Sequence, residues 1–302
     1  MKRWIAAFAA AALFLGGCAS GTTDGDAPDV AATPDDDPMR VAALTYETAE
    51  LVAALGAADR LVMVPEAVTN PVLTNHHEAM VAVETHAATE TTTNAEAVIQ
   101  AAPDLVLLSD RHGLEEGVGT VLRDAGFEVI VLPNSWASVD DMLANIRITG
   151  EALGLDDEAE ELSATIESGM AARELDGERP RVLVLGNQAG QPFITAGAAF
   201  PLEVLRLAGG DDVSAELGFT ATAPITVEQV VQADPDAILL IDMNGSGRRL
   251  FEPIMDSPAI ATLAGSAEDR VLLLEGRQVQ ALGLEHAVEG LDAINAWLTD
   301  LE

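Results

Sequence analysis

The chain has 302 residues, of which 49% are hydrophobic and only 4% aromatic, so it has enough apolar material for two domains with mainly aliphatic cores. Fifty acidic residues against 15 basic ones give a formal charge of −35. A surface of this sign repels nucleic acid and anionic lipid, which argues against either as a partner. We interpret the acidity as an adaptation to high salt, which screens self-repulsion.

The first 17 residues predict a lipoprotein signal peptide. A basic start precedes an apolar run that ends at Leu15 and is too short to span a membrane. The tetrapeptide LGGC at 15–18 resembles the bacterial lipobox, in which the cysteine is lipidated and becomes the N-terminus. The alternative is a cleaved signal followed by an incidental cysteine. Cys18 is the only cysteine, so no internal disulfide can form.

Residues 18–38 predict a flexible acidic tether, because small residues, acids, Gly and Pro cannot bury enough apolar surface to fold. Removal of the signal peptide takes away Lys2 and Arg3 and changes the net charge from −35 to −37. Lys2 is the only lysine, so every basic residue of the mature chain is an arginine.

One phrase occurs twice at an offset of 132 residues. NAEAVIQAAPDLVLLSD (94–110) and TVEQVVQADPDAILLID (226–242) match at nine of 17 positions. Asn94 and Thr226 suit N-caps, and a proline follows each helix of about two turns and stops it. The apolar runs that follow are continuous, as in strands covered on both faces of a parallel sheet. Two copies predict two α/β lobes of similar construction.

Five further apolar runs predict the other strands. They are Arg40–Leu44, Arg60–Val64 and Phe127–Leu132 in the first half, and Arg181–Leu185 and Arg270–Leu274 in the second. Residues 138–175 have a helical pattern without proline, which Gly150 and Gly154 break in two. We therefore predict a first lobe at 39–153, a linking helix at 154–178 and a second lobe at 179–302.

Four segments then carry a family resemblance. They are RVAALTYETAELVAALGAADRLVMV (40–64), NAEAVIQAAPDLVLL (94–108), LRLAGGDDVSAE (205–216) and TVEQVVQADPDAILL (226–240). In this order they resemble the substrate-binding lipoproteins of ABC importers for iron–siderophore complexes, haem and cobalamin. The resemblance implies an α/β fold of two Rossmann-like lobes with parallel-rich sheets, joined by one long rigid helix, with the ligand in the cleft between them. It also implies a monomer, lipid-anchored on the extracytoplasmic face, that serves a permease with a cytoplasmic ATPase.

The resemblance assigns a docking role to two repeated acids. In such proteins one surface glutamate on each lobe docks against arginines of the permease, and the matching positions here are Glu96 and Glu228. The alternative is a generic acid in the first helical turn, which the helix dipole stabilises.

Candidate ligand contacts follow the carboxyl ends of the predicted strands, where open parallel sheets bind ligands. They are Tyr46, Arg111, His112, Trp136, Asn187, Gln188, Met243, Arg248 and Arg249. The arginines suit the carboxylate or catecholate oxygens of an anionic chelate, or simply pair with surface acids. Tyr46 and Trp136 either face the ligand or pack in the core.

Three cargoes fit these residues. Ferric siderophore ranks first because of the cleft arginines, and cobalamin follows because a neutral corrinoid needs aromatics and amides such as Trp136 and Gln188. Haem ranks third, through Tyr46, His112 or Met243 as iron ligands.

A bare zinc or manganese site is less favoured, because no pair of the five histidines has helical ligand spacing. The chain has no dinucleotide fingerprint, P-loop or nucleophile elbow, so an anchored enzyme is the weaker alternative and no intrinsic cofactor is expected.

Overall fold

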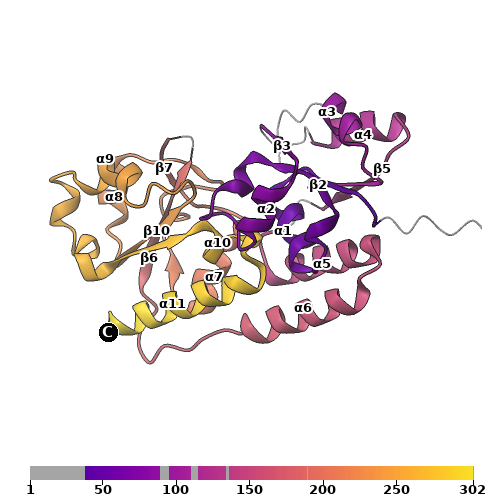
Figure 1. Cartoon of the computed structure of the whole chain (residues 1–302). Helices are drawn as coiled ribbons and strands as arrows, with labels where there is room; N and C mark the ends of the chain where they lie inside the picture. The colour runs from indigo at the N-terminus through magenta and orange to yellow at the C-terminus, as the bar shows by residue number, and fades with distance from the viewer. Residues whose placement is uncertain (1–37, 89–94, 110–114, 134–135, 189, 302) are drawn as a thin grey trace, which may run out of the picture. The chain divides into compact units, whose positions relative to one another are not determined.

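The computed structural model describes residues 38–301 except 89–94, 110–114, 134–135 and 189 (Figure 1). The predicted signal peptide, Cys18 and the tether up to residue 37 lie outside the described residues. Residues 38–302 form one compact unit. In the ranges that are described, each helix is too short or too polar to cross a bilayer.

The first lobe is built on a parallel sheet. Its described residues form five strands in the order β3-β2-β1-β4-β5, and all four strand pairs are parallel. The strands are β1 Val41–Ala43, β2 Leu61–Pro65, β3 Thr85–Ala87, β4 Leu105–Ser109 and β5 Glu128–Leu132. The helices are α1 Tyr46–Ala54, α2 His77–Ala82, α3 Ala95–Ala101 and α4 Glu115–Asp124, with 3-10 turns η1 Ala58–Arg60 and η2 Glu66–Thr69.

The second lobe is mixed but parallel-rich. Its described strands follow the order β11-β10-β6-β7-β9, with β8 beside β6, and β7 runs antiparallel to β6 and β9. The strands are β6 Arg181–Gln188, β7 Gln191–Ile194, β8 Asp211–Asp212, β9 Ala223–Pro224, β10 Ala237–Asp242 and β11 Val271–Glu275. The helices are α7 Phe200–Ala208, α8 Val227–Ala233, α9 Glu252–Met255, α10 Gly276–Val279 and α11 Ala287–Asp300. Its 3-10 turns are η3 Arg249–Phe251, η4 Ile260–Thr262, η5 Ala264–Ser266, η6 Glu268–Arg270 and η7 Ala281–His286.

The prediction of two α/β lobes is confirmed, and all seven predicted strands form. The two repeated strands, β4 and β10, are buried on both faces. Leu105 and Leu107 of β4 join the same apolar cluster as Ala237 and Leu239 of β10, while the alternate residues of each strand face a cluster inside their own lobe. The continuous apolar runs therefore reflect burial on both sides of each sheet.

An arginine closes the repeated helix in each lobe. The Arg40 side chain donates to the carbonyls of Ala101 and Ala102, at 2.8 and 3.1 Å. The Arg181 side chain donates to the carbonyls of Ala233 and Asp234, both at 2.9 Å. These groups are the last carbonyls of α3 and α8, which have no partner within the helix.

The residue after each helix adopts a left-handed conformation, with φ of 47° at Ala102 and 41° at Asp234, before the proline that follows. One residue beyond each proline, Asp104 accepts a hydrogen bond from the Arg40 amide and Asp236 accepts one from the Arg181 amide, both at 2.8 Å. The two lobes thus use the same closure at equivalent positions.

The linking segment ends earlier than predicted. It forms two helices, α5 Val139–Leu153 and α6 Asp156–Gly169, which pack side by side (Figure 1). Gly154 ends α5 with φ of 67°, as its predicted break requires. The predicted helix to residue 178 is too long, because α6 ends at Gly169.

Contacts distant in the sequence end α6. A Cβ at Gly169 would lie 2.5 Å from the Val288 side chain, so the helix end sits directly against α11. The Arg173 side chain then donates to the Gly169 carbonyl and pairs with Asp292 at 2.7 Å. These contacts hold the chain after Gly169 on its path toward β6. A longer α6 would lose the contacts of Arg173 with Gly169 and Asp292.

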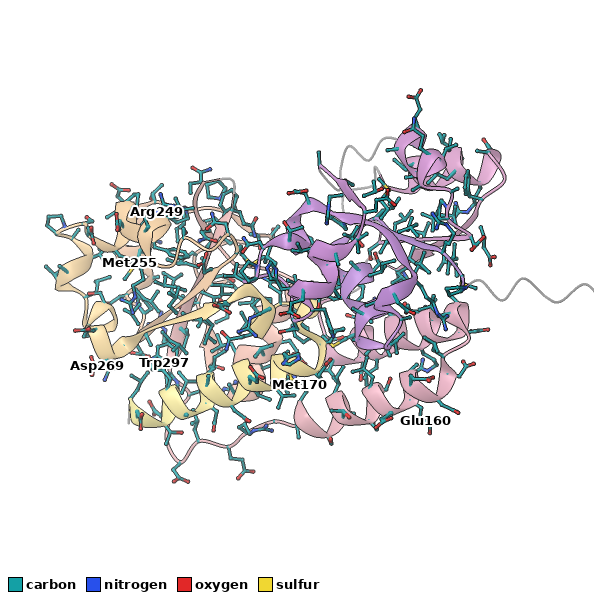
Figure 2. All side chains as sticks on the ribbon, viewed as in Figure 1. Glu160, Met170, Arg249, Met255, Asp269 and Trp297 are labelled. Carbon is teal, nitrogen blue, oxygen red and sulfur yellow. The ribbon has the colours of Figure 1, made fainter. Side chains whose placement is uncertain are left out.

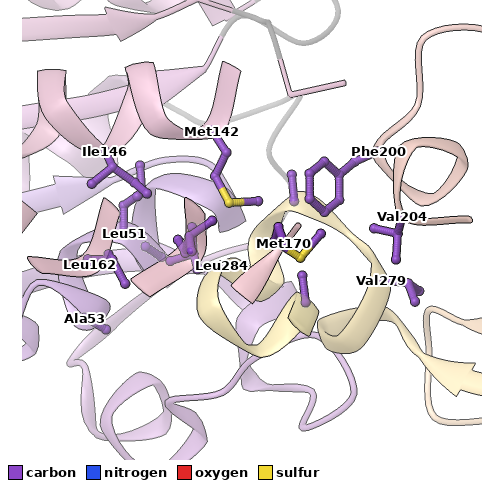
Figure 3. Packing of buried hydrophobic residues seen from close by; sticks show 14 of the residues in the cluster. Leu51, Ala53, Met142, Ile146, Leu162, Met170, Phe200, Val204, Val279 and Leu284 are labelled. Carbon is purple, nitrogen blue, oxygen red and sulfur yellow. The ribbon is translucent and has the colours of Figure 1, made fainter. Parts of the chain in front are cut away.

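A continuous apolar cluster joins the lobes. Leu51 of α1, Met142 and Ile146 of α5 and Met170 after α6 belong to the same cluster as Phe200 of α7 (Figure 3). All five side chains are 3% exposed or less. Because each such side chain stabilises the fold by about 1.5–3 kcal/mol through burial, separation of the lobes would carry a large penalty.

The arginine closure yields the first prediction. Arg181→Ala leaves two helix-terminal carbonyls without their donor, and we expect it to lower the free energy of unfolding by about 1–2 kcal/mol. Arg206→Ala is the matched control, because that side chain is 59% exposed and pairs with Glu203 on its own helix. The control is expected to cost less than about 0.5 kcal/mol. Thermal unfolding at constant salt measures both, and equal effects would contradict a special role for the closure.

Candidate ligand-binding cleft

A cavity of about 550 Å³ opens between the lobes. The first lobe contributes Glu47, Trp136, Ala137 and Asp141, and the second contributes Gln188, Thr195, Phe200, Thr222, Gln280 and further small residues. Glu47 follows β1, Trp136 follows β5, Gln188 ends β6 and Gln280 follows β11. The cavity therefore lies beyond the carboxyl ends of the parallel strands, where the sequence predicted ligand contacts.

Trp136 is fixed at the first-lobe wall. Its indole Nε1 donates to the Ser109 hydroxyl at 2.7 Å, at the end of β4, and the ring also packs against the apolar cluster. Asp141 caps α5 nearby and accepts from the amides of Ala137 and Ser138, both at 3.2 Å. Trp136 thus lines the cavity and packs in the core at the same time, and Gln188 lines the opposite wall.

Asn187 acts inside the second lobe. It is 2% exposed, and its amide donates to Asp242, Asn244 and Ser246 at 2.9–3.1 Å. Its carbonyl oxygen accepts from the Met243 amide at 2.6 Å. Both polar atoms of the side chain therefore bind the loop after β10, and Asn187 shapes the cleft from behind where the sequence predicted a direct contact.

Asp242 holds the same loop. Its carboxylate accepts hydrogen bonds from the amides of Asn244, Gly245, Ser246 and Gly247 at 2.7–3.2 Å. Burial raises the pKa of Asp242, but the bonds from Asn187 and from these amides outweigh it, and the pKa lies below its usual value. The loop is thereby wrapped around one buried carboxylate.

Tyr46 and Met243 lie where the two lobes meet. Both are half-buried and pack against a small apolar cluster of Val72, Leu73 and Leu282. The Met243 sulfur accepts a hydrogen bond from Gln280 at 3.5 Å, and Gln280 itself lines the cavity. Among the described residues of the wall, neither Tyr46 nor Met243 is present. Both support the cavity from beside it.

The arginines of the second lobe do not reach the cavity. Arg248 is exposed and donates to the Val271 carbonyl at 2.9 Å. Val271 is the first residue of β11, which is parallel to β10. The Arg248 side chain therefore reaches toward the amino ends of these strands, whereas the cleft lies at their carboxyl ends. Arg249 is exposed on η3, and Figure 2 shows it near the outer helices of the second lobe. Neither arginine is among the described residues that line the cavity, because the wrapped loop turns them away, and a ligand contact at Arg248 or Arg249 stays a prediction. Arg111 and His112 lie outside the described residues.

Of the described lining residues, the sequence predicted only Trp136 and Gln188 as ligand contacts. Those it did not predict include Glu47, Asp141, Thr195, Phe200, Thr222 and Gln280. Gln280 follows a strand that the sequence did predict, so the rule about carboxyl ends would have found it. Thr195 and Phe200 follow β7, a four-residue hairpin strand that contains Pro192 and carries no strong strand signal.

Both predicted docking acids are exposed, in the first turn of their helices. Glu96 lies on α3 and Glu228 on α8. The Glu228 backbone amide and the Thr226 hydroxyl lower the pKa of the Glu228 carboxyl below its usual value. Thr226 also forms the predicted N-cap, by accepting from the Gln229 amide. Its counterpart Asn94 lies outside the described residues.

Comparison with known proteins agrees with this architecture. The family model described as periplasmic binding protein matches residues 41–277. The chain belongs to the periplasmic binding protein family.

Individual relatives are more distant. A cobalamin-binding protein of Halobacterium salinarum is 27% identical over 228 residues, which are 74% of this chain and 59% of that protein. The chain thus matches about three fifths of that relative. The uncharacterized ABC transporter substrate-binding lipoprotein YvrC of Bacillus subtilis is 24% identical, over 72% of this chain and 68% of that one.

Solved structures share the fold. The periplasmic haem-binding protein RhuT of Roseiflexus superimposes with a TM-score of 0.74 at 21% identity, covering 88% of this chain and 99% of that one. A periplasmic haem-binding protein of Pseudomonas aeruginosa gives a TM-score of 0.70 at 22% identity, over 87% and 94% of the two chains. At this identity the likeness establishes the two-lobed fold.

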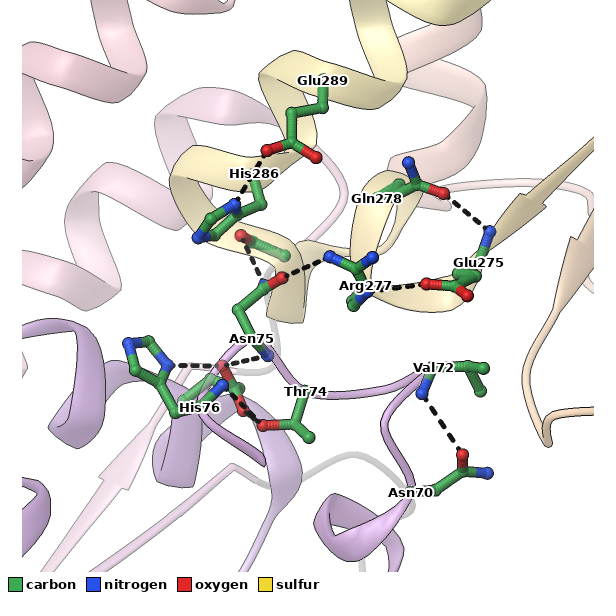
Figure 4. A network of polar contacts seen from close by, with 12 residues as sticks. Asn70, Val72, Thr74, Asn75, His76, Glu275, Arg277, Gln278, His286 and Glu289 are labelled. Carbon is green, nitrogen blue, oxygen red and sulfur yellow. Dashed lines mark hydrogen bonds and ion pairs between the residues drawn. The ribbon is translucent and has the colours of Figure 1, made fainter. Parts of the chain in front are cut away.

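A polar junction adjoins the cavity in this binding protein. The side-chain amide of Asn75 donates to the Gly283 carbonyl at 3.3 Å, and its side-chain oxygen accepts from the Arg277 guanidinium at 3.2 Å (Figure 4). The Arg277 backbone amide donates to the Val72 carbonyl at 2.8 Å. Arg277 and Gly283 flank Gln280, a cavity residue. The base of the cleft is therefore fixed from both lobes.

A buried carboxylate anchors the first-lobe side of this junction. Glu50 is fully buried, and it accepts hydrogen bonds from the Thr74 hydroxyl and from His76 Nδ1, the latter at 3.0 Å. The bond to Glu50 raises the pKa of His76, burial opposes it, and the charges of Glu50 and Glu285 add to the rise. Where side chains are described, no group of three or more His, Cys, Asp or Glu is arranged to hold a metal ion.

This pair gives a pH prediction. Because the folded-state pKa of His76 is raised, its charged bond to Glu50 is fully present below about pH 6.5 and is lost as the pH rises through the folded-state value. We expect His76→Asn to lower stability by about 1 kcal/mol near pH 6, and by less as the pH approaches about 8. Urea unfolding of both proteins at constant salt measures the difference. The exposed neighbour His77 provides the control, His77→Asn, and an effect of His76→Asn that is independent of pH would contradict the charged bond.

Proposed function

We propose that this protein is an extracytoplasmic, lipid-anchored solute-binding protein that delivers cobalamin to an ABC importer. The observation that carries the choice of cargo is the chemistry of the cavity wall. Its described residues offer aromatic rings in Trp136 and Phe200, amides in Gln188 and Gln280, and no arginine. A corrinoid has broad apolar faces and a rim of amides, which these groups complement.

The acids of the wall favour the same cargo. Glu47 is 4% exposed at the cavity, and Asp141 lies on the same side. Carboxylates beside an anionic chelate would repel it, whereas a corrinoid without net charge is not repelled. The cobalamin-binding relative in Halobacterium salinarum supports the same choice.

Ferric siderophore, which ranked first from the sequence, is now the second candidate. That ranking rested on arginines in both lobes, and Arg248 and Arg249 point away from the cavity. Its remaining basis is Arg111, which follows β4 in the sequence. Haem is the third candidate, since the haem-binding neighbours share the fold at low identity.

The rest of the proposal concerns anchoring and partners. Cys18 carries the lipid, and the protein acts as a monomeric binder with no catalytic activity. A permease and its cytoplasmic ATPase receive the closed, loaded form through Glu96 and Glu228, one on each lobe. Family membership supports a transport role in place of an enzymatic one.

The cargo assignment predicts a selective response. Cyanocobalamin at about a thousand times its dissociation constant adds roughly 4 kcal/mol and raises the melting temperature by several degrees. Ferric catecholate, hydroxamate and citrate siderophores, haem, zinc and manganese form the comparison panel. Trp136→Ala is expected to weaken binding about tenfold or more, because it removes an aromatic wall.

Trp297→Phe is the control for that variant. Trp297 lies on α11, donates to the Asp269 carbonyl at 3.0 Å and does not line the cavity (Figure 2 shows Trp297 and Asp269). A shift with a siderophore or haem in place of cyanocobalamin would replace the cargo assignment. No shift with any member of the panel would contradict binding of a metal chelate.

The docking assignment predicts a separation of binding from transport. Reversal of both acids, Glu96→Arg with Glu228→Arg, is expected to reduce cyanocobalamin uptake at least about tenfold while cargo affinity is unchanged. Glu160→Arg with Glu167→Arg makes the same change in net charge on exposed positions of α6 and serves as control. Uptake in cells that carry each full-length variant, with calorimetry on the purified proteins, measures both. Loss of cargo affinity, or equal loss of uptake in the control, would sink the assignment.

A further inference from the structure

Two exposed apolar residues occupy equivalent positions in the lobes. Among the described residues, the exposed large apolar side chains are Val81, Ile99, Val121 and Val231, at 50%, 43%, 53% and 38%. Ile99 and Val231 are 132 residues apart, which is the offset of the repeat. Ile99 lies on α3 and Val231 at the same place on α8.

Each of these residues shares a helix face with a repeated acid. Glu96 and Ile99 are three positions apart on α3, as are Glu228 and Val231 on α8, and residues at this spacing are neighbours on a helix surface. Each lobe therefore presents a carboxylate and an aliphatic side chain together, on a helix of seven residues.

Packing within the chain does not account for the pair. The buried face of each helix is already provided by Val98 and Val230, which are fully buried at equivalent positions. Ile99 and Val231 point away from that face and leave apolar surface in water. Single exposed apolar residues are common, but the same exposure at the same place in two diverged copies indicates a shared use.

Charge alone would not distinguish these two helix faces from the rest of the acidic surface. The chain carries 50 acids, so an exposed carboxylate is the commonest feature of its surface. At about 1 M salt the screening length falls to about 3 Å, which confines any ionic attraction to direct contact. An apolar contact keeps its strength under these conditions, and it distinguishes two helices from the acidic surface around them.

We propose that Ile99 and Val231, together with Glu96 and Glu228, form two matched docking patches for the importer permease. Each patch fits a partner surface with a cation beside an apolar recess, and the pair fits a partner that presents two such surfaces related by a two-fold axis. This inference rests on the proposed function and adds to it the apolar half of the contact. The acids orient the protein on the permease. The aliphatic side chains contribute binding free energy that does not weaken at high salt.

The test titrates the full chain, loaded with cyanocobalamin, onto membrane vesicles from cells that lack their own copy of the protein. Half-maximal stimulation of ATP hydrolysis reports association. Ile99→Ala and Val231→Ala are each expected to raise the required concentration about fivefold, and together about 25-fold. Alanine is a better helix former than either residue, so unwinding of α3 or α8 cannot explain a loss. Val81→Ala, outside the repeat, is the control and leaves the titration unchanged.

Salt separates the two halves of the patch. Between about 0.2 and 2 M KCl, the effect of Glu96→Gln with Glu228→Gln is expected to shrink, while the effect of the alanine pair persists. Normal titration by the alanine pair, with stimulation lost on charge reversal at Glu96 and Glu228, would overturn the apolar contact and leave the proposed function intact. Stimulation that is absent for the wild type, or that survives charge reversal, would overturn the proposed docking function itself.

Discussion

The structure depends on one apolar cluster that runs through both lobes. Side chains from α1, α5, α7 and α11 meet in it, and Met170, just after α6, closes it from the linking segment. The cleft is therefore a gap above a shared core, and its floor cannot open without exposing that core to water. The polar junction around Asn75 and Arg277 fixes the same floor at a second place. Ligand entry and release then require small movements of the cavity walls, as expected of lobes joined by a rigid linker.

The repeated sequence segment forms the same local structure in both lobes. In each lobe a short helix feeds a strand that is buried on both faces, and the strand directs alternate residues to the shared cluster and to its own lobe. The turn between them is left-handed at Ala102 and Asp234 and is closed by the same arginine and aspartate contacts. What the helix offers to solvent is repeated as well: an exposed acid and an exposed aliphatic side chain three positions later, opposite a buried valine.

The sequence predicted the strands because a buried strand must be apolar whatever its neighbours are. It predicted where the cavity lies, because the carboxyl ends of parallel strands share one edge. It did not predict the direction of Arg248, since that depends on how Asp242 and Asn187 wrap the loop before it. The end of α6 was also beyond local reasoning, because Val288 and Asp292, more than a hundred residues away, decide it. The local sequence pattern thus predicts the strands and lobes. The direction of individual side chains depends on contacts between segments that are distant in the sequence.

The arginine closure has a consequence for how this acidic chain tolerates its solvent. Most described arginines donate to backbone carbonyls: Arg40, Arg60, Arg123, Arg173, Arg179, Arg181, Arg248 and Arg270. A carbonyl carries no net charge, so dissolved ions have little attraction to weaken in these bonds. A guanidinium also serves two carbonyls at once, which the single ammonium of a lysine matches poorly. Three of these arginines, Arg173, Arg179 and Arg181, also pair with exposed carboxylates, and salt screens those ion pairs. The bonds to backbone carbonyls are therefore the part of each arginine's contacts that high salt weakens least.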